Sequence, residues 1–158
     1  MRVDFKACVG WKQGDANLRP AIGVYSVGSK AKTSTDRQFA QFEFDVSHFR
    51  DPTGQKQFRG KSGLAPEVQT WVKDDVRVPG LIQNCLILAD DLVKPKANTE
   101  GDTTRMAAAS QWLSFSFKDH HGIWAAPAIA ELVANALSDA GYTVAVLHRE
   151  LKEIETTV

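Results

Sequence analysis

The segment from residue 112 to residue 147 constrains the fold more than any other part of the chain. Residues 112–117 read as a strand, and a short polar connection follows them. Residues 125–140 carry apolar side chains at helical spacing, and Gly141 ends that helix. Residues 143–147 then predict a second strand. Because a strand, a helix and a strand in this order form a right-handed parallel unit, we expect an α/β domain.

Two further strands are predicted nearer the amino terminus, at residues 21–27 and 39–46. The second has the clearest pattern, since Phe42, Phe44 and Val46 alternate with polar residues and therefore share one face. A helix is expected from about residue 66. Another is expected after residues 79–80, with an apolar stripe made of Leu81, Ile82, Cys85, Leu86, Ala89, Leu92 and Val93.

These elements predict a single layered α/β domain over residues 1–158, with a mostly parallel sheet flanked by helices. Residues 1–20 are expected to be a variable extension, residues 94–110 a loop and residues 149–158 a tail. A chain of 158 residues with 43% hydrophobic and 24% charged residues suits one globular domain.

The charge and cysteine content exclude several classes of protein. Formal net charge is zero, so any binding to nucleic acid or anionic lipid requires a local patch. Cys8 and Cys85 are too few and too far apart for a disulfide framework or a metal site. We see no signal-peptide core and no stretch of membrane-spanning length, and therefore expect a cytoplasmic protein without a cofactor or metal.

Open parallel sheets bind ligands beyond the carboxyl ends of their strands, which directs attention to two segments. Asp45 closes the clearest strand, and Lys118, His120, His121 and Gly122 connect a strand to a helix. A helix start offers unpaired N–H groups and a positive dipole end, which favour an anion. The pattern predicts a ligand site here, although exposed turns are often polar with no ligand at all.

The chain also resembles the C-terminal domain of the RNase adapter protein RapZ. Residues 44–52, FDVSHFRDP, are similar to a strand end of the form D-V-R-x-F-x-x-P in that family. Residues 58–68, FRGKSGLAPEV, resemble its segment L-R-x-x-T-G-L-D-P-x-V. The loop at 120–122 is similar to its glycine-rich G-C-x-G-G-x-H-R-S loop, and residues 148–151 match its H-R-D-L ending. The ordered set covers roughly residues 21–151.

The resemblance implies an α/β domain with a phosphate-binding pocket, used in the family to bind RNA and to sense a phosphorylated amino sugar. Full-length members carry a P-loop kinase-like domain first. This chain contains no Walker A sequence, so we expect a stand-alone copy of the second domain.

The expected pocket loop departs from the family at several positions. Residues 123–126 read Ile-Trp-Ala-Ala where the family has R-H-R-S, and Ser47 stands where it has an arginine. Each charge-assisted contact to phosphate contributes about 1.5–3 kcal/mol, so we expect weaker anion binding held by backbone N–H groups alone. Trp124 then fills an inactive pocket or forms a surface for a partner.

The stretch from residue 30 to residue 61 carries seven Lys or Arg against four acids, with Phe49 and Phe58 among them. Cations beside accessible aromatic side chains suit RNA, whereas a small excess on a solvated loop serves solubility. The residues expected to contact RNA or a protein partner are Arg50, Arg59, Lys61, Trp124, His148 and Arg149.

Three enzyme classes find no support in the sequence. Residues 117–127 hold neither the cysteine nor the arginine of a phosphatase loop, adjacent histidines do not make a metal site, and no nucleophile elbow occurs. We therefore expect a non-catalytic, regulatory binding module that engages RNA or a protein partner. The alternative is a sensor of a phosphorylated metabolite or a residual enzyme. The oligomeric state stays open, a homo-oligomer included.

Overall fold

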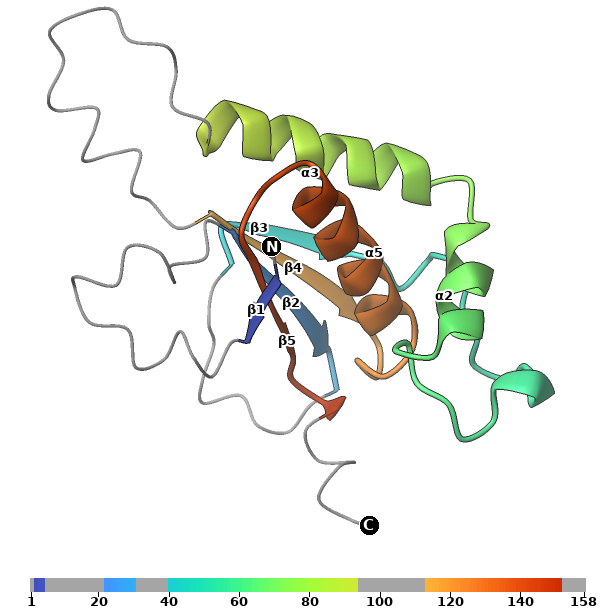
Figure 1. Ribbon diagram of the computed structural model, residues 1–158. Coiled ribbons are helices and arrows are strands. Elements are labelled where there is room, and N and C mark those ends of the chain that lie inside the picture. The colour runs from blue at the N-terminus through green and yellow to red at the C-terminus, as the bar shows by residue number, and fades with distance from the viewer. Residues whose placement is uncertain (1, 5–21, 31–39, 94–112, 152–158) are drawn as a thin grey trace, which may run out of the picture.

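The computed structural model of the chain describes residues 2–4, 22–30, 40–93 and 113–151 (Figure 1). Cys8, the predicted loop at 94–110 and the end of the predicted tail lie outside these residues. So do Phe39 and Trp112, which the sequence assigns to strands.

A five-stranded sheet forms the centre of the domain, and every strand pair in it is parallel. Its strands, in spatial order, are β1 (Arg2–Asp4), β5 (Val144–His148), β2 (Ile22–Gly28), β4 (Leu113–Asp119) and β3 (Phe42–Asp45). The predicted α/β class and parallel sheet are confirmed. Since β2 lies between β4 and β5, the unit at residues 112–147 crosses over a central strand.

In the described residues, three α-helices pack with this sheet: α2 (Pro66–Lys73), α3 (Val78–Leu92) and α5 (Ala125–Asp139). Figure 1 shows α5 lying along the sheet, with α3 and α2 beside it. A short 3-10 turn, η1 (Lys56–Phe58), lies in the segment that links β3 to α2. The connections therefore place α2 and α5 next to each other, with the long β3–α2 segment near the start of α5.

The core explains why α5 lies so close to the strands. Most of its residues are buried, and many are alanines, whose small side chains allow a close approach. Phe115 and Phe117 of β4 are fully buried beneath it and pack against Ile129 and neighbouring aliphatic side chains. The helix is thus fixed relative to the strand ends.

Two details of α3 differ from the prediction. The helix begins at Val78 rather than after Gly80, because a proline is tolerated in the first helical turn. Leu92, predicted to lie on the buried stripe, is 51% exposed, since it lies in the last turn of the helix. Leu81, Cys85 and Ala89 are buried as predicted.

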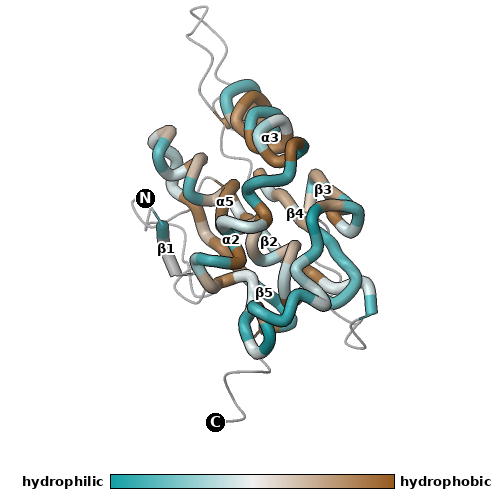
Figure 2. Tube along the Cα trace, turned by 90° about the vertical axis from the view of Figure 1, so that its right-hand side faces the viewer, coloured by the Kyte–Doolittle hydropathy of each residue, from teal (hydrophilic) through white to brown (hydrophobic). Residues whose placement is uncertain are grey.

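Polar residues gather at the carboxyl ends of the strands. In Figure 2 the tube around the end of β5 is mostly hydrophilic, whereas α3 and α5 carry hydrophobic stretches. Lys118 lies near the end of β4 and His120 follows that strand, while Asp45 ends β3 at the same edge of the sheet. This edge is where a parallel sheet offers a ligand site.

Candidate functional site

The structure brings together the two segments that the sequence singled out. Asp45 pairs in register with Lys118, and the backbone N–H of Val46 donates to the carbonyl of Lys118 at 2.8 Å. The end of β2 joins them, since the N–H of Ser29 donates to the carbonyl of Asp119 at 2.8 Å. The ends of β2, β3 and β4 therefore meet at the loop that leads into α5.

The start of α5 is occupied by a side chain of the protein itself. One carboxylate oxygen of Asp119 accepts the backbone N–H groups of His121, at 3.0 Å, and of Gly122. The other oxygen accepts the N–H of Ala126 at 2.8 Å. Asp119 is only 8% exposed. We call these three N–H groups with Asp119 the α5 cradle; they are the donors that a bound anion would need.

Sequence reasoning named this helix start as an anion site but missed that Asp119 fills it. Asp119 lies five residues before Trp124, the N-cap position of α5, so a search of the sequence for N-cap residues would not have found it. A phosphate that approaches this helix start would find the N–H groups already bound, and the negative charge of Asp119 would repel it.

A second carboxylate lies beside the α5 cradle. Oε2 of Glu150 is buried, and it has no hydrogen-bond partner among the described residues. Burial raises the pKa of Glu150, and the nearby charge of Asp119 acts in the same direction. A Cβ added at Gly122, whose φ is +72°, would lie 2.6 Å from this oxygen. The strand ends are therefore closely packed and acidic.

The other predicted ligand residues lie around the α5 cradle and mostly have partners. Nζ of Lys118 forms an ion pair with Glu43 at 2.9 Å, and this hydrogen bond raises the pKa of Lys118. Asp45 accepts hydrogen bonds from the hydroxyl and the backbone N–H of Ser47, which lower its pKa. Lys118 and Asp45 therefore already have ion-pair or hydrogen-bond partners within the protein.

His120 and His121 are exposed, and their rings meet edge to face with centroids 4.9 Å apart. The ring of His121 in turn meets Trp124 at 5.6 Å and 87°. Together the three side chains form a row of aromatic rings that begins at the strand ends and extends to the start of α5.

Trp124 separates two hollows of different size. The inner recess has a volume of about 30 Å³ and is lined by Ser47, Asp51, Thr53, Asp119, His120, His121, Trp124 and Ala125. That volume suits a water molecule or two, not a sugar phosphate. The outer hollow has a volume of about 220 Å³ and is lined by Pro52, Thr53, Gly54, Gln55, Lys56, Phe58, Arg59, Gly60 and Trp124.

The wall between the hollows is held in place by the segment before α2. The indole N–H of Trp124 donates to the carbonyl of Lys61 at 2.9 Å. The N–H of Gly63 donates to the carbonyl of Ile123 at 2.8 Å, and a Cβ added at Gly63 would lie 2.2 Å from the carbonyl oxygen of Trp124. Only glycine fits this approach, so residues 60–63 pack directly on the loop before α5.

The cations around the outer hollow divide into free and paired groups. Lys56 and Arg59 are exposed, and their side chains form no hydrogen bond or ion pair with any residue that the structure describes. Lys61 is paired with Glu67. The guanidinium of Arg50 lies 3.7 Å from the ring centre of Trp71. The sequence analysis named Arg59 as a candidate site residue and did not name Lys56.

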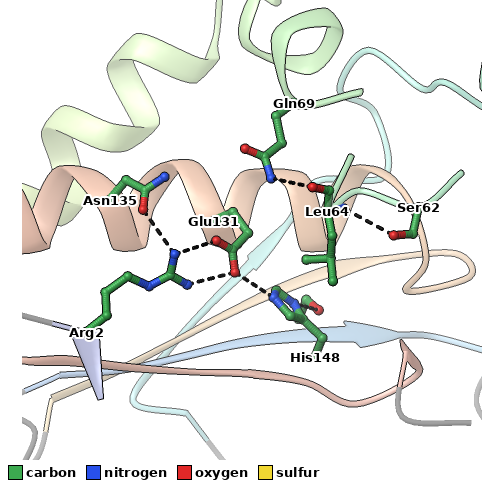
Figure 3. Close-up of polar contacts among 8 residues, drawn as sticks. Arg2, Ser62, Leu64, Gln69, Glu131, Asn135 and His148 are labelled. Atoms are coloured by element: carbon green, nitrogen blue, oxygen red, sulfur yellow. Dashed lines mark hydrogen bonds and ion pairs between the residues drawn. The ribbon is translucent and has the colours of Figure 1, made fainter. Parts of the chain in front are cut away.

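The last predicted contacts, His148 and Arg149, lie on a different side of the sheet end. His148 sits between two partners: Nδ1 is 2.8 Å from the hydroxyl of Ser26, and Nε2 is 2.9 Å from Glu131 (Figure 3). The His148 side chain is only 13% exposed, so its ring lies within the contact between α5 and the sheet. Arg149 is half-buried, and its N–H donates to the carbonyl of Ser26.

This arrangement is a structural network and not a nucleophile site. Ser26 is fully buried, so its hydroxyl cannot reach a substrate. Arg2 of β1 binds both oxygens of Glu131, at 2.6 and 2.8 Å. Burial alone would raise the pKa of Glu131, but the hydrogen bonds from His148 and Arg2 outweigh it and lower the pKa to about 2. The network ties β1, β2 and β5 to α5.

Two further classes of site were sought in the part of the chain that the structure describes. No group of three His, Cys, Asp or Glu side chains there is arranged to hold a metal ion. Nor is any described helix both long and apolar enough to cross a membrane.

Comparison with known proteins gives two findings. Residues 20–152 match the family model described as the RapZ C-terminal domain. The chain is also 29% identical over 153 residues to a "nucleotide-binding protein" of Lacticaseibacillus casei, and equally to one of Lacticaseibacillus paracasei. Each alignment covers 97% of this chain and 48% of the relative, so the chain spans about half the length of these curated relatives.

Proposed function

Because the chain belongs to the RapZ C-terminal domain family, we propose that it is a non-catalytic module that binds RNA at the outer hollow. The observation that carries this proposal is the contrast in donor groups on the two sides of Trp124. Asp119 already satisfies the N–H groups of the α5 cradle, whereas Lys56 and Arg59 have no partner among the described residues.

Unpaired cations beside an aromatic ring match the chemistry of RNA. Lys and Arg side chains bind backbone phosphates, and aromatic rings stack on bases. Lys56, Arg59 and Trp124 all line the outer hollow, and His120 and His121 extend the aromatic row beyond it. The patch is local, which suits a chain of zero net charge.

The burial of two side chains that could act as nucleophiles, Cys85 and Ser26, is consistent with a non-catalytic role. Cys85 is fully buried, and burial raises the pKa of its thiol to about 12. Ser26 is buried beneath the network of His148 and Glu131. Neither side chain can meet a substrate as an activated nucleophile.

A sensor of a small phosphorylated metabolite fits the geometry less well. Such a ligand would have to displace the carboxylate of Asp119 or enter an inner recess of about 30 Å³. The relatives are called nucleotide-binding proteins, but this chain spans only about half of their length, so that name does not by itself assign a nucleotide site to this chain.

The proposal is tested by RNA binding at two salt concentrations. A 12-nucleotide RNA of mixed sequence, labelled with a fluorophore, is titrated with the whole chain while anisotropy is recorded. We expect Lys56→Gln combined with Arg59→Gln to weaken binding at least about tenfold. The slope of log affinity against log salt should become shallower by about 1.4, at about 0.7 for each lost phosphate contact.

The matched control is Lys73→Gln, which removes an exposed cation from the last turn of α2 and should leave the affinity unchanged. If the unaltered chain does not bind RNA, the proposal is wrong. In that case, if affinity capture with this chain isolates a protein that contacts Val76, which is 91% exposed, the result would favour a protein partner. We place the site of action in the cytoplasm as part of the same proposal.

A further inference from the structure

The aromatic wall of the outer hollow is fixed before any ligand arrives. The indole N–H of Trp124 is bound to the carbonyl of Lys61, and the ring of His121 meets the indole edge to face. A ring held on two sides loses little conformational freedom when a ligand stacks on it. Trp124 therefore offers a preorganised face for a planar group.

The rest of the hollow limits the size of that group. Its volume of about 220 Å³ lies below the roughly 300–1,000 Å³ typical of sites for drug-sized ligands. Pro52 and Phe58, both buried, form its apolar side. Gly54 and Gly60 have positive φ angles of 85° and 77° and carry no side chain to narrow the opening. A hollow of this volume is of the size that one ring system occupies.

The charges around the hollow indicate which chemical group is joined to the planar ring of the ligand. Lys56 and Arg59 line the same hollow, with side chains that have no partner among the residues described. In a nucleotide, a planar base and an anionic phosphate are joined within one unit, so one nucleotide can reach both kinds of group.

We propose that the outer hollow is a subsite for one unpaired nucleobase of RNA, stacked on Trp124, with a neighbouring phosphate bound by Lys56 and Arg59. The inference rests on the proposed RNA-binding function and adds that the RNA is single-stranded where it meets the hollow. A base inside a duplex is covered on both faces by its neighbours and cannot enter.

The test compares one RNA in two forms. The 12-nucleotide strand is measured alone and annealed to its complement as a blunt duplex, with the unaltered chain and with Trp124→Leu, Trp124→Phe and Trp71→Phe. Trp124→Phe keeps an aromatic face. Trp71→Phe is the matched control, because Trp71 lies outside the lining of the hollow and its indole nitrogen has no partner in the described structure.

We expect the single strand to bind at least about tenfold more tightly than the duplex. Trp124→Leu should lower the affinity for the single strand at least about fivefold, the ratio that loss of one base–aromatic stack produces. Trp124→Phe should stay within about threefold, and Trp71→Phe should match the unaltered chain. Quenching of indole fluorescence on binding should disappear in Trp124→Phe and persist in Trp71→Phe.

The outcomes separate this inference from the proposed function. If single strand and duplex bind equally, or if Trp124→Leu and Trp124→Phe both bind as the unaltered chain does, the base subsite is wrong while RNA binding stands. If no RNA binds but adenosine monophosphate quenches Trp124, the hollow is a subsite for a free nucleotide and the RNA proposal is wrong. If neither ligand gives a signal, both are wrong. Thermal unfolding of each variant shows whether it is folded.

Discussion

Trp124 lines both the inner recess beside the α5 cradle and the outer hollow, and the two regions differ in what their polar groups already bind. In the α5 cradle, Asp119 accepts three backbone N–H groups and is almost fully buried. In the outer hollow, Lys56 and Arg59 have no partner among the described residues. The difference is that the N–H groups at the start of α5 are already bound within the protein, whereas the two cations of the outer hollow are available to a ligand as far as the described residues show.

The largest expected effect comes from disturbing the packing of residues 60–63 on the start of α5, next to both regions. Gly63→Ala places a Cβ about 2.2 Å from the carbonyl oxygen of Trp124 and 2.6 Å from the N of Ala128, both backbone atoms of a packed helix start. Because neither can easily move, we expect a loss of about 3 kcal/mol in the free energy of unfolding, measured in urea. RNA binding should fall with it.

Gly80→Ala is the matched control, since a Cβ there meets nothing within 4 Å and the residue lies in α3. Alanine should stabilise that helix by up to about 1 kcal/mol. A Gly63→Ala variant as stable as the unaltered chain would show that residues 60–63 do not pack on the start of α5.

The second prediction removes the carboxylate that accepts the N–H groups of the α5 cradle. Asp119→Ala removes the acceptor of three N–H groups and should cost about 2 kcal/mol of stability. It should also free those donors for an anion. We expect inorganic phosphate to raise the melting temperature of Asp119→Ala but not that of the unaltered chain. Equal stabilisation of both proteins by phosphate would mean that Asp119 does not block the cradle.

The third prediction uses the network at the other side of α5 to distinguish folding from binding. The folded-state pKa of Glu131 is lowered to about 2 from an ordinary value of 4.5. Its contribution to stability is therefore complete above pH 4.5 and is lost as the pH falls toward 2. We expect Glu131→Gln to lose about 1–2 kcal/mol at neutral pH and to show a weaker pH dependence of unfolding in this range.

RNA affinity measured at neutral pH, where both proteins are folded, should be the same for Glu131→Gln and the unaltered chain, because Glu131 lines neither hollow. A large loss of affinity in this folded variant would place RNA on the side of His148 and Arg149 instead.

The smallest expected effect compares two neighbouring cations. Lys61 is paired with Glu67, whereas Arg59 has no partner in the described residues. We expect Arg59→Gln to weaken RNA binding about fivefold and Lys61→Gln to weaken it less than about twofold, with little change in stability for either. Anisotropy titrations at one salt concentration suffice. The reverse order would mean that the ion pair opens to bind RNA.

The sequence was sufficient to predict the α/β class, four of the five strands and the meeting of the strand ends, whereas β1 lies in the stretch that was expected to be an extension. Alternation of Phe42 and Phe44 with Glu43 and Asp45 located β3, and the helical spacing of residues 125–140 located α5. Since the carboxyl ends of parallel strands lie at one edge, the approach of Asp45 to residues 118–122 followed from topology.

The use of individual polar groups could not be predicted in the same way. A helix start has free N–H groups in any sequence, but only the packed loop shows that Asp119 turns back to bind them. The sequence alone suggests that His148 lies on the surface, whereas in the structure its Nε2 contacts Glu131 of α5. Lys56 and Lys61 are equivalent as residue types, and only the position of Glu67 distinguishes them.

The most direct measurement is to follow the backbone and indole N–H signals of the isotope-labelled chain by NMR as the 12-nucleotide single strand is added. We expect the largest shifts at the indole N–H of Trp124 and at residues 53–60, with the N–H signals of His121, Gly122 and Ala126 nearly unchanged because Asp119 holds them. Large shifts confined to these three signals would contradict binding at the outer hollow and would show that the ligand binds at the α5 cradle.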